Sequence, residues 1–245
     1  MKDVIVIKIG GVAAQKLSAS FIKQVKNWVD NGKKIILVHG GGVVINQLLL
    51  ERHLPSHKVK GLRVTNQSDI PIIKKALLDI VGQGLTQQFN QADIDSIQLV
   101  SHLGQTVSAE YIDKSIYGYV GQVTDIHSRY LEQLLDDHII PVLASLGENA
   151  DGQVLNINAD YLAAAVAKKF QAEKLILMTD TQGVLEDKKV LPQILTSQVP
   201  QKIQKGIIKD GMIPKIESAV QTVLSGVSQV WIGNSLSAGT LIAEG

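Results

Sequence analysis

The sequence VIVIKIGG at residues 4–11 and the sequence KIILVHGGG at residues 34–42 share one order: an apolar, β-branched run is followed by glycines. Such runs predict strands that are buried on both faces, as in a parallel sheet. A helical pattern begins near Val43, so each glycine run is expected to join a strand to a helix. In an open parallel sheet these turns lie at the carboxyl edge, where ligands bind.

The rest of the chain continues this alternation. Further strands are predicted at residues 96–101, 139–145, 174–179 and 229–232. Apolar residues spaced three or four apart predict helices between the strands. They include Phe21 and Val25, Ile73 and Leu77, Leu131 and Leu135, Leu162 and Val166, and Ile216 and Val220. We therefore expect a three-layer αβα sandwich around a mostly parallel open sheet.

Two segments interrupt the alternation, at residues 102–123 and 183–211. Both are expected to form hairpins or lids, and the glycine content of the first makes it our candidate lid. A boundary near residues 170–173 is expected to separate an N-terminal lobe, 1–170, from a C-terminal lobe, 171–245, with one sheet running through both.

Composition excludes several classes of function. The 24 basic and 23 acidic residues leave a formal charge of +1, so there is no basic field for nucleic acid, and a small polar or anionic ligand fits better. The absence of cysteine excludes thiolate catalysis and zinc–thiolate sites. No stretch approaches the roughly 18 apolar residues of a membrane span. A cytoplasmic protein with no membrane partner is the expectation.

The two glycine loops form a candidate anion cradle. Glycines allow backbone N–H groups to approach a ligand, and the following helix N-terminus adds partial positive charge. The sequence contains no G-x-x-x-x-G-K-[ST], and Ile45 stands where G-x-G-x-x-G requires its third glycine. For either loop alone, a tight turn without a ligand is an equally good interpretation.

Two lysines occupy positions that favour a bound anion. Lys8 ends an otherwise apolar strand, where a buried ammonium group needs a negative partner. Lys215 lies at the start of the last long helix, where its charge opposes the helix dipole at a cost of a few tenths to about 1 kcal/mol. Ordinary solvated lysines remain the alternative for both.

Three polar residues complete the candidate set. Asn156 and Asn158 are expected to point the same way along an extended segment. Asp160 is expected to be the N-cap of the following helix, from which Asn156 is too distant. Arg63, flanked by apolar residues, is suited to forking onto a carboxylate.

Seven motifs follow one another along the chain: KIGG at 8–11, HGGG at 39–42, GLRVT at 61–65, GYVG at 118–121, NINAD at 156–160, TDTQGV at 179–184 and DGMIPK at 210–215. In this order they resemble the N-acetylglutamate kinases, a branch of the amino acid kinase superfamily, over nearly the whole chain. GLRVT and NINAD are the segments that point to this branch. Asp210 stands where glycine would be expected as readily.

The resemblance implies ATP-dependent phosphorylation, with Mg²⁺, of the side-chain carboxylate of N-acetyl-L-glutamate in arginine biosynthesis. It implies that Lys8 and Lys215 contact the phosphoryl group and that Asp160 orients both. The N-terminal lobe would bind the acceptor and dimerise, and the C-terminal lobe would bind the nucleotide. The implied acceptor-binding residues are Gly41, Gly42, Arg63 and Asn156. The implied nucleotide-binding residues are Gly10, Gly11, Asp180, Thr181, Gln182, Gly183, Val184, Leu185, Ile207, Ile208 and Lys209, with no protein metal ligands.

The resemblance leaves the acceptor and the regulation open. Free glutamate, aspartate, aminoadipate, carbamate and UMP are alternative acceptors within the superfamily, and a catalytically silent sensor is an alternative of another class. Arginine-inhibited relatives carry an extra N-terminal helix, whereas this chain starts directly at its first predicted strand. A homodimer that is insensitive to arginine is therefore expected.

Overall fold

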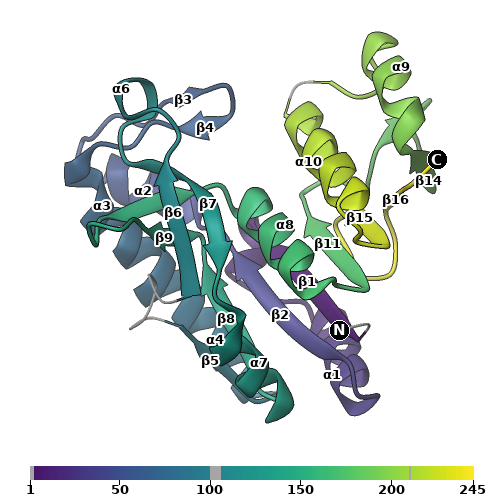
Figure 1. The fold of residues 1–245 in the computed structure, drawn as a ribbon, viewed down its shortest axis with the longest axis horizontal. Helices are drawn as coiled ribbons and strands as arrows, with labels where there is room; N and C mark the ends of the chain where they lie inside the picture. The colour runs from purple at the N-terminus through teal and green to yellow at the C-terminus, as the bar shows by residue number, and fades with distance from the viewer. Residues whose placement is uncertain (1–2, 100–105, 210) are drawn as a thin grey trace.

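An eight-stranded sheet forms the centre of the protein (Figure 1). The computed structural model describes residues 3–99, 106–209 and 211–245. Strand order is β14-β16-β15-β11-β1-β2-β8-β5, and every neighbouring pair is parallel except β15 and β16. The strands are β1 (Val4–Ile9), β2 (Lys34–His39), β5 (Ser96–Gln98), β8 (Ile140–Ala144), β11 (Lys174–Met178), β14 (Gln193–Leu195), β15 (Gln229–Gly233) and β16 (Thr240–Ala243). The predicted mostly parallel sheet is confirmed.

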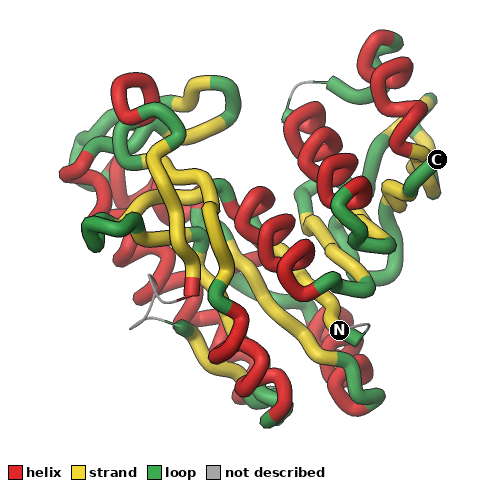
Figure 2. Tube along the Cα trace, viewed as in Figure 1, coloured by secondary structure: helices red, strands yellow, loops and turns green. Residues whose placement is uncertain are grey.

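Helices cover both faces of this sheet, and Figure 2 shows them flanking the strands. Alternation along β1 explains how: Val4 and Val6 belong to one buried cluster, and Ile5, Ile7 and Ile9 belong to the other. The first cluster contains residues of α7 (Ser128–Asp136), α8 (Ala159–Phe170) and α10 (Met212–Leu224). The second contains residues of α1 (Ala19–Asp30) and α2 (Gly42–Leu50). The three-layer prediction is therefore confirmed.

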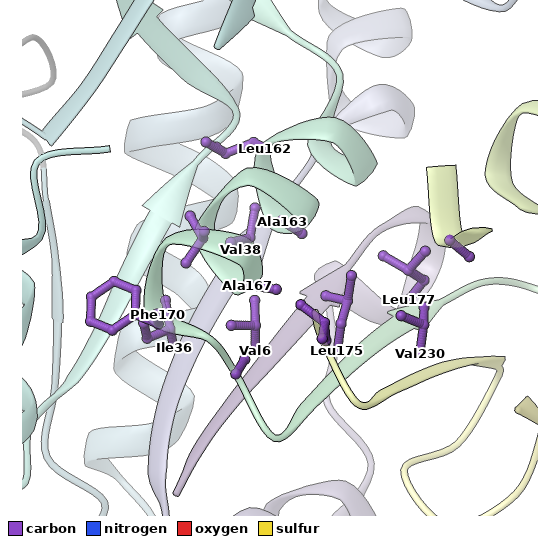
Figure 3. Close-up of a cluster of buried hydrophobic side chains, with 14 of the residues drawn as sticks. Val6, Ile36, Val38, Leu162, Ala163, Ala167, Phe170, Leu175, Leu177 and Val230 are labelled. Carbon is purple, nitrogen blue, oxygen red and sulfur yellow. The ribbon is translucent and has the colours of Figure 1, made fainter. Parts of the chain in front are cut away.

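Helix α8 packs directly over the middle of the sheet. Leu162, Ala163 and Ala167 are fully buried, and Figure 3 shows them over strand residues that include Val6 and Val38. Burial of a large aliphatic side chain contributes about 1.5–3 kcal/mol. This packing fixes the N-terminus of α8 beside the carboxyl ends of β1 and β2.

One long helical stretch lies on the opposite face. It consists of α3 (Ile70–Lys74), the π-helical segment η3 (Lys75–Gly82) and α4 (Gln83–Asn90), preceded by the 3₁₀ turn η2 (Gln67–Asp69). Another 3₁₀ turn, η1 (Gly11–Ala14), follows β1. The π-helical segment is a local departure of a kind that often lies near functional sites.

A small closed barrel lies within the N-terminal half of the chain. It closes in the order β10-β7-β6-β9, from β6 (Val107–Tyr111), β7 (Val120–Ile126), β9 (Leu146–Glu148) and β10 (Val154–Ile157). Strands β6 and β7 form an antiparallel hairpin with α6 (Lys114–Tyr117) at its tip, as predicted for this segment. Residues 102–105 of the candidate lid, and Asp210, lie outside the described residues.

The second interrupting segment also contains a hairpin, β12 (Leu185–Glu186) with β13 (Lys189–Val190). It continues through β14, the 3₁₀ turn η4 (Thr196–Gln198) and α9 (Val199–Gln204). The sheet contains strands from both sides of the expected boundary at residues 170–173, and the division into two lobes stays a prediction. Among the described residues, none of the helices is long and apolar enough to cross a membrane.

Candidate active site

A cavity of about 220 Å³ lies at the carboxyl ends of β1 and β2, between the two glycine loops. The short strands β3 (Lys58–Val59) and β4 (Leu62–Arg63) close its outer side. Eight of the residues proposed from the sequence line this cavity: Lys8, Gly10, Gly11, Gly41, Gly42, Arg63, Asn156 and Asp160. The fold thus brings together residues as far apart in the sequence as Lys8 and Asp160.

Lys8 reaches this cavity from the face of β1 that carries Val4 and Val6. Its ammonium Nζ lies 2.9 Å from Asp160 Oδ1 and donates a hydrogen bond to the carbonyl of Met178 at 3.4 Å. The residue is 9% exposed. The negative partner that the sequence called for is therefore a carboxylate of the protein itself.

Asp160 is not the N-cap of α8, so that prediction is wrong. Asn158 occupies the N-cap with an extended backbone, and its Oδ1 accepts from the N–H groups of Asp160 (2.8 Å) and Tyr161 (3.3 Å). Asp160 lies one position inside the first turn, where the helix dipole stabilises an anion. Since Asn158 already caps the helix, the carboxylate of Asp160 is available to the lysines.

Lys215 completes an ion triad from the first turn of α10. Its Nζ lies 2.6 Å from Asp160 Oδ2, so the two lysines bind opposite oxygens of one carboxylate. Burial opposes ionisation of Asp160, but Lys8 and Lys215 outweigh it and hold the pKa of the carboxyl below its ordinary value. Burial lowers the pKa of Lys215, and Asp160 offsets part of that effect.

Arg63 and Asn156 both line the cavity and are connected to each other through Thr65. The Asn156 side chain donates to Thr65 Oγ1 at 3.1 Å, and that hydroxyl donates to the Arg63 carbonyl at 3.1 Å. Thr65 is fully buried, and its backbone pairs with Tyr117 and Tyr119 of the β6–β7 hairpin. This side of the cavity is therefore connected to the small barrel.

The guanidinium of Arg63 is held in place by side chains that the sequence did not single out. Its Nη2 donates to Asn46 Oδ1 at 2.6 Å and to the Gly42 carbonyl at 3.4 Å, and its Nη1 donates to Ser56 Oγ. Burial lowers the pKa of Arg63. Asn46 follows the second glycine loop by one helical turn, which is the only signal that could have indicated it.

The proposed nucleotide residues are more dispersed. Asp180 lies against the first glycine loop, since a Cβ at Gly11 would be 2.6 Å from Asp180 Oδ1. The side chains of Val184 and Ile208 are buried in the hydrophobic core, so only their backbone could face a nucleotide. These residues belong to two segments, 180–185 and 207–209. The segments approach each other where Lys202 of α9 pairs with Glu186 of β12 at 3.3 Å. Thr181, Gln182 and Lys209 are exposed, as is Leu185, and Gly183 is buried.

Comparison with known proteins assigns the chain to a family. The family model described as "Amino acid kinase family" matches residues 3–234. The chain belongs to the amino acid kinase family. Among curated members, a Streptococcus gordonii protein named acetylglutamate kinase is 74% identical, and one from Streptococcus sanguinis with the same name is 73% identical. Both alignments span 245 residues and cover 100% of each chain.

The fold also agrees with that of a solved structure. A crystal structure of a Streptococcus mutans UA159 protein superposes with a TM-score of 0.95 at 53% identity, and the match covers 99% of each chain. The fold is therefore that of the family.

Proposed function

We propose that the chain transfers the γ-phosphoryl group of ATP to the side-chain carboxylate of N-acetyl-L-glutamate, giving N-acetyl-L-glutamyl 5-phosphate and ADP, as a step of arginine biosynthesis. The observation that carries the proposal is the Lys8–Asp160–Lys215 triad beside a cavity that also contains Arg63. Full-length relatives that are named acetylglutamate kinase support the choice of acceptor.

The proposed chemistry needs alignment and positive charge rather than a base. A glutamate side chain has a reference pKa of about 4.3, so the nucleophile is already ionised at neutral pH. A carboxylate oxygen attacks the γ-phosphorus, the bond to the β–γ bridging oxygen breaks, and ADP leaves with that electron pair. Lys8, Lys215 and the N–H groups of the glycine loops would stabilise the equatorial oxygens.

In this proposal Asp160 positions the ammonium groups of Lys8 and Lys215 so that both can contact the transferred phosphoryl group. The oxygens of Asp160 contact Lys8 and Lys215 at 2.9 and 2.6 Å, so neither lysine needs to move far to meet a phosphoryl group. Effective positioning of this kind can supply several kcal/mol of barrier lowering.

Mg²⁺ would arrive with the nucleotide in this proposal. Both oxygens of Asp160 face ammonium groups, and neither the lysines nor the N–H groups of the glycine loops can bind a cation. The hard phosphate oxygens of ATP would therefore supply the ligands. When bound there, the ion reduces repulsion between the two anionic substrates.

Acceptor binding would depend on four residues. The Arg63 guanidinium would pair with a carboxylate of the substrate, and Asn156 with the Gly41 and Gly42 backbone would hold the remaining polar groups. Gly10 and Gly11 would approach the nucleotide phosphates. The segments that contain Asp180 to Leu185 and Ile207 to Lys209 would line the nucleotide on the C-terminal lobe, residues 171–245.

The location and the assembly are part of the proposal. Consumption of ATP in amino-acid synthesis is typical of the cytoplasm. Strand β5 forms an edge of the large sheet and exposes Ile97 (39%), a feature that favours pairing with a second copy. Sedimentation analysis is expected to find a homodimer, and a monomer at micromolar concentration would contradict it.

A panel of acceptors tests the proposed activity. ADP release is measured with ATP, Mg²⁺ and either N-acetyl-L-glutamate, free glutamate, aspartate, aminoadipate, carbamate or UMP, and hydroxylamine traps any acyl phosphate as a hydroxamate. We expect hydroxamate chiefly from N-acetyl-L-glutamate. Preference for another acceptor, or tight binding of both substrates in calorimetry without turnover, would overturn the assignment.

A further inference from the structure

We propose that His39 is a positioning residue that turns the N–H of Gly41 toward the active-site cavity. The inference rests on the proposed function, in which Gly41 binds substrate. His39 is fully buried, and it faces away from Lys8 because β2 places Ile35, Leu37 and His39 on the side of the second hydrophobic cluster. Its ring therefore lies on the buried side of the second glycine loop, opposite the cavity.

The ring of His39 contacts the loop through one hydrogen bond. Its Nδ1 lies 3.2 Å from the carbonyl oxygen of Gly40. A carbonyl oxygen can only accept, so Nδ1 carries the proton and Nε2 does not. Burial lowers the pKa of His39 to about 4, which keeps this ring neutral at physiological pH.

The geometry of the peptide bond converts this contact into an orientation. In a trans peptide the C=O of Gly40 and the N–H of Gly41 lie in one plane and point in opposite directions. No cis peptide bond occurs among the described residues. Because His39 draws the carbonyl oxygen to the underside of the loop, the N–H of Gly41 is directed to the other side. Both glycines line the cavity on that side.

The segment η3 supports this arrangement at two points. A Cβ added at Gly82 would lie 2.9 Å from His39 Nε2 and 2.1 Å from Gln98 Nε2, so the ring and the amide pack against a bare Cα. Both nitrogens are buried without a hydrogen-bond partner in the structure. At the second point, a Cβ at Gly41 would lie 2.7 Å from Leu77 Cδ2.

The chemical consequence is a donor that is oriented before substrate arrives. A backbone N–H aimed at an oxygen that gains charge in phosphoryl transfer stabilises the transition state without reorganisation. The Gly41 N–H can serve in this way only while the Gly40 carbonyl stays turned toward His39.

Two isosteric variants test the proposal. In His39→Asn the amide Nδ2 takes the place of ring Nδ1 and can still donate to Gly40. In His39→Gln the amide nitrogen takes the place of Nε2 and cannot. We expect His39→Asn to stay within about fivefold of wild type in kcat/KM for N-acetyl-L-glutamate, and His39→Gln to lose about 100-fold. The KM for ATP and the Tm should be alike in both variants.

Equal losses in the two variants, or two variants with wild-type kinetics, would overturn the proposal. The ring tautomer gives a readout that needs no variant and no activity. Long-range ¹H–¹⁵N correlation spectra of the ligand-free protein are expected to show a protonated Nδ1 and a bare Nε2 for His39. A protonated Nε2 would overturn the inference even if the enzyme phosphorylates N-acetyl-L-glutamate, and failure of that activity would leave the tautomer result standing.

Discussion

Asp160 presents one carboxylate to two ammonium groups, at 2.9 Å from Lys8 and 2.6 Å from Lys215. A guanidinium is planar and bulkier than an ammonium and cannot take the same place in a tight phosphoryl site. We therefore expect Lys8→Arg and Lys215→Arg to fold normally and to lose about 100-fold or more in kcat.

The matched control for these variants is Lys169→Arg. Lys169 lies at the far end of α8 from Asp160 and pairs with Asp125 at 3.0 Å. Lys169→Arg is therefore the same substitution in a paired lysine, but away from the cavity. Steady-state kinetics with saturating ATP should show wild-type kcat for the control. Wild-type turnover in both of the other variants would remove the lysines from the reaction.

The lowered pKa of Lys215 predicts the alkaline limb of the pH profile. Activity requires the ammonium form, so kcat/KM should fall as the pH rises through a pKa that lies below the ordinary 10.5. Asp160 raises the pKa of Lys215, so Asp160→Asn should move this limb to lower pH. The measurement is kcat/KM as a function of pH for the wild type and for Asp160→Asn. An alkaline limb that stays in place or moves to higher pH would contradict the effect of Asp160 on the pKa of Lys215.

Substitution of Arg63 is expected to affect the KM for the acceptor more than kcat. Lysine cannot form the fork that Asn46 and Ser56 hold in place, so Arg63→Lys should raise the KM for N-acetyl-L-glutamate about tenfold while lowering kcat less. Arg52→Lys is the control, since Arg52 donates to the Leu48 carbonyl at the end of α2. An unchanged KM in Arg63→Lys would exclude Arg63 from the acceptor site.

The role of a residue could be predicted from the sequence where a buried charge requires a partner of opposite charge. Lys8 at the end of an apolar strand is such a case, and the structure supplies Asp160 as that partner. The cap of α8 was not predictable, because Asn158 and Asp160 are both good N-caps and the sequence does not fix which one begins the helix. Asn46 and Ser56 were missed because their contact with Arg63 depends on tertiary folding.

At the level of elements, the π-helical segment η3 makes a local prediction. Gly82 and Gly84 lie two residues apart on one helical stretch, yet a Cβ at Gly82 would press on His39 and Gln98 and one at Gly84 meets nothing within 4 Å. Gly82→Ala should lose about 1–3 kcal/mol of unfolding free energy through overpacking. Gly84→Ala should be neutral or gain up to about 1 kcal/mol from helix propensity.

Chemical denaturation of the two alanine variants measures this difference. Equal changes in unfolding free energy would mean that His39 and Gln98 can move aside for a methyl group at Gly82 without cost, and would contradict this prediction. Periodicity around Ile73 and Leu77 predicted a helix but could not indicate its π-helical turn, which differs from an α-helix in its backbone hydrogen bonds. The closure of the small barrel was missed because an expected hairpin within residues 102–123 and an expected extended segment at Asn156 do not indicate how these strands pair with one another.

For the molecule as a whole, the six long apolar runs were sufficient to predict the layered sheet. They could not predict the strand order, because the β1–β11 pairing joins segments about 170 residues apart and leaves no local pattern. Strand β14, which forms one edge of the sheet, and its neighbour β16 were missed because each is short. The site followed from the fold, since parallel strands bring their carboxyl ends, and hence the glycine loops, to one edge.

The central claim is that a substrate carboxylate attacks ATP directly, and the fate of its oxygen tests this. The protein is given ATP, Mg²⁺ and N-acetyl-L-glutamate labelled with ¹⁸O in the side-chain carboxylate, and hydroxylamine then cleaves the product at carbon. We predict that the phosphate released carries one ¹⁸O from the carboxylate. Unlabelled phosphate without hydroxamate would show that water is the nucleophile and would contradict the account.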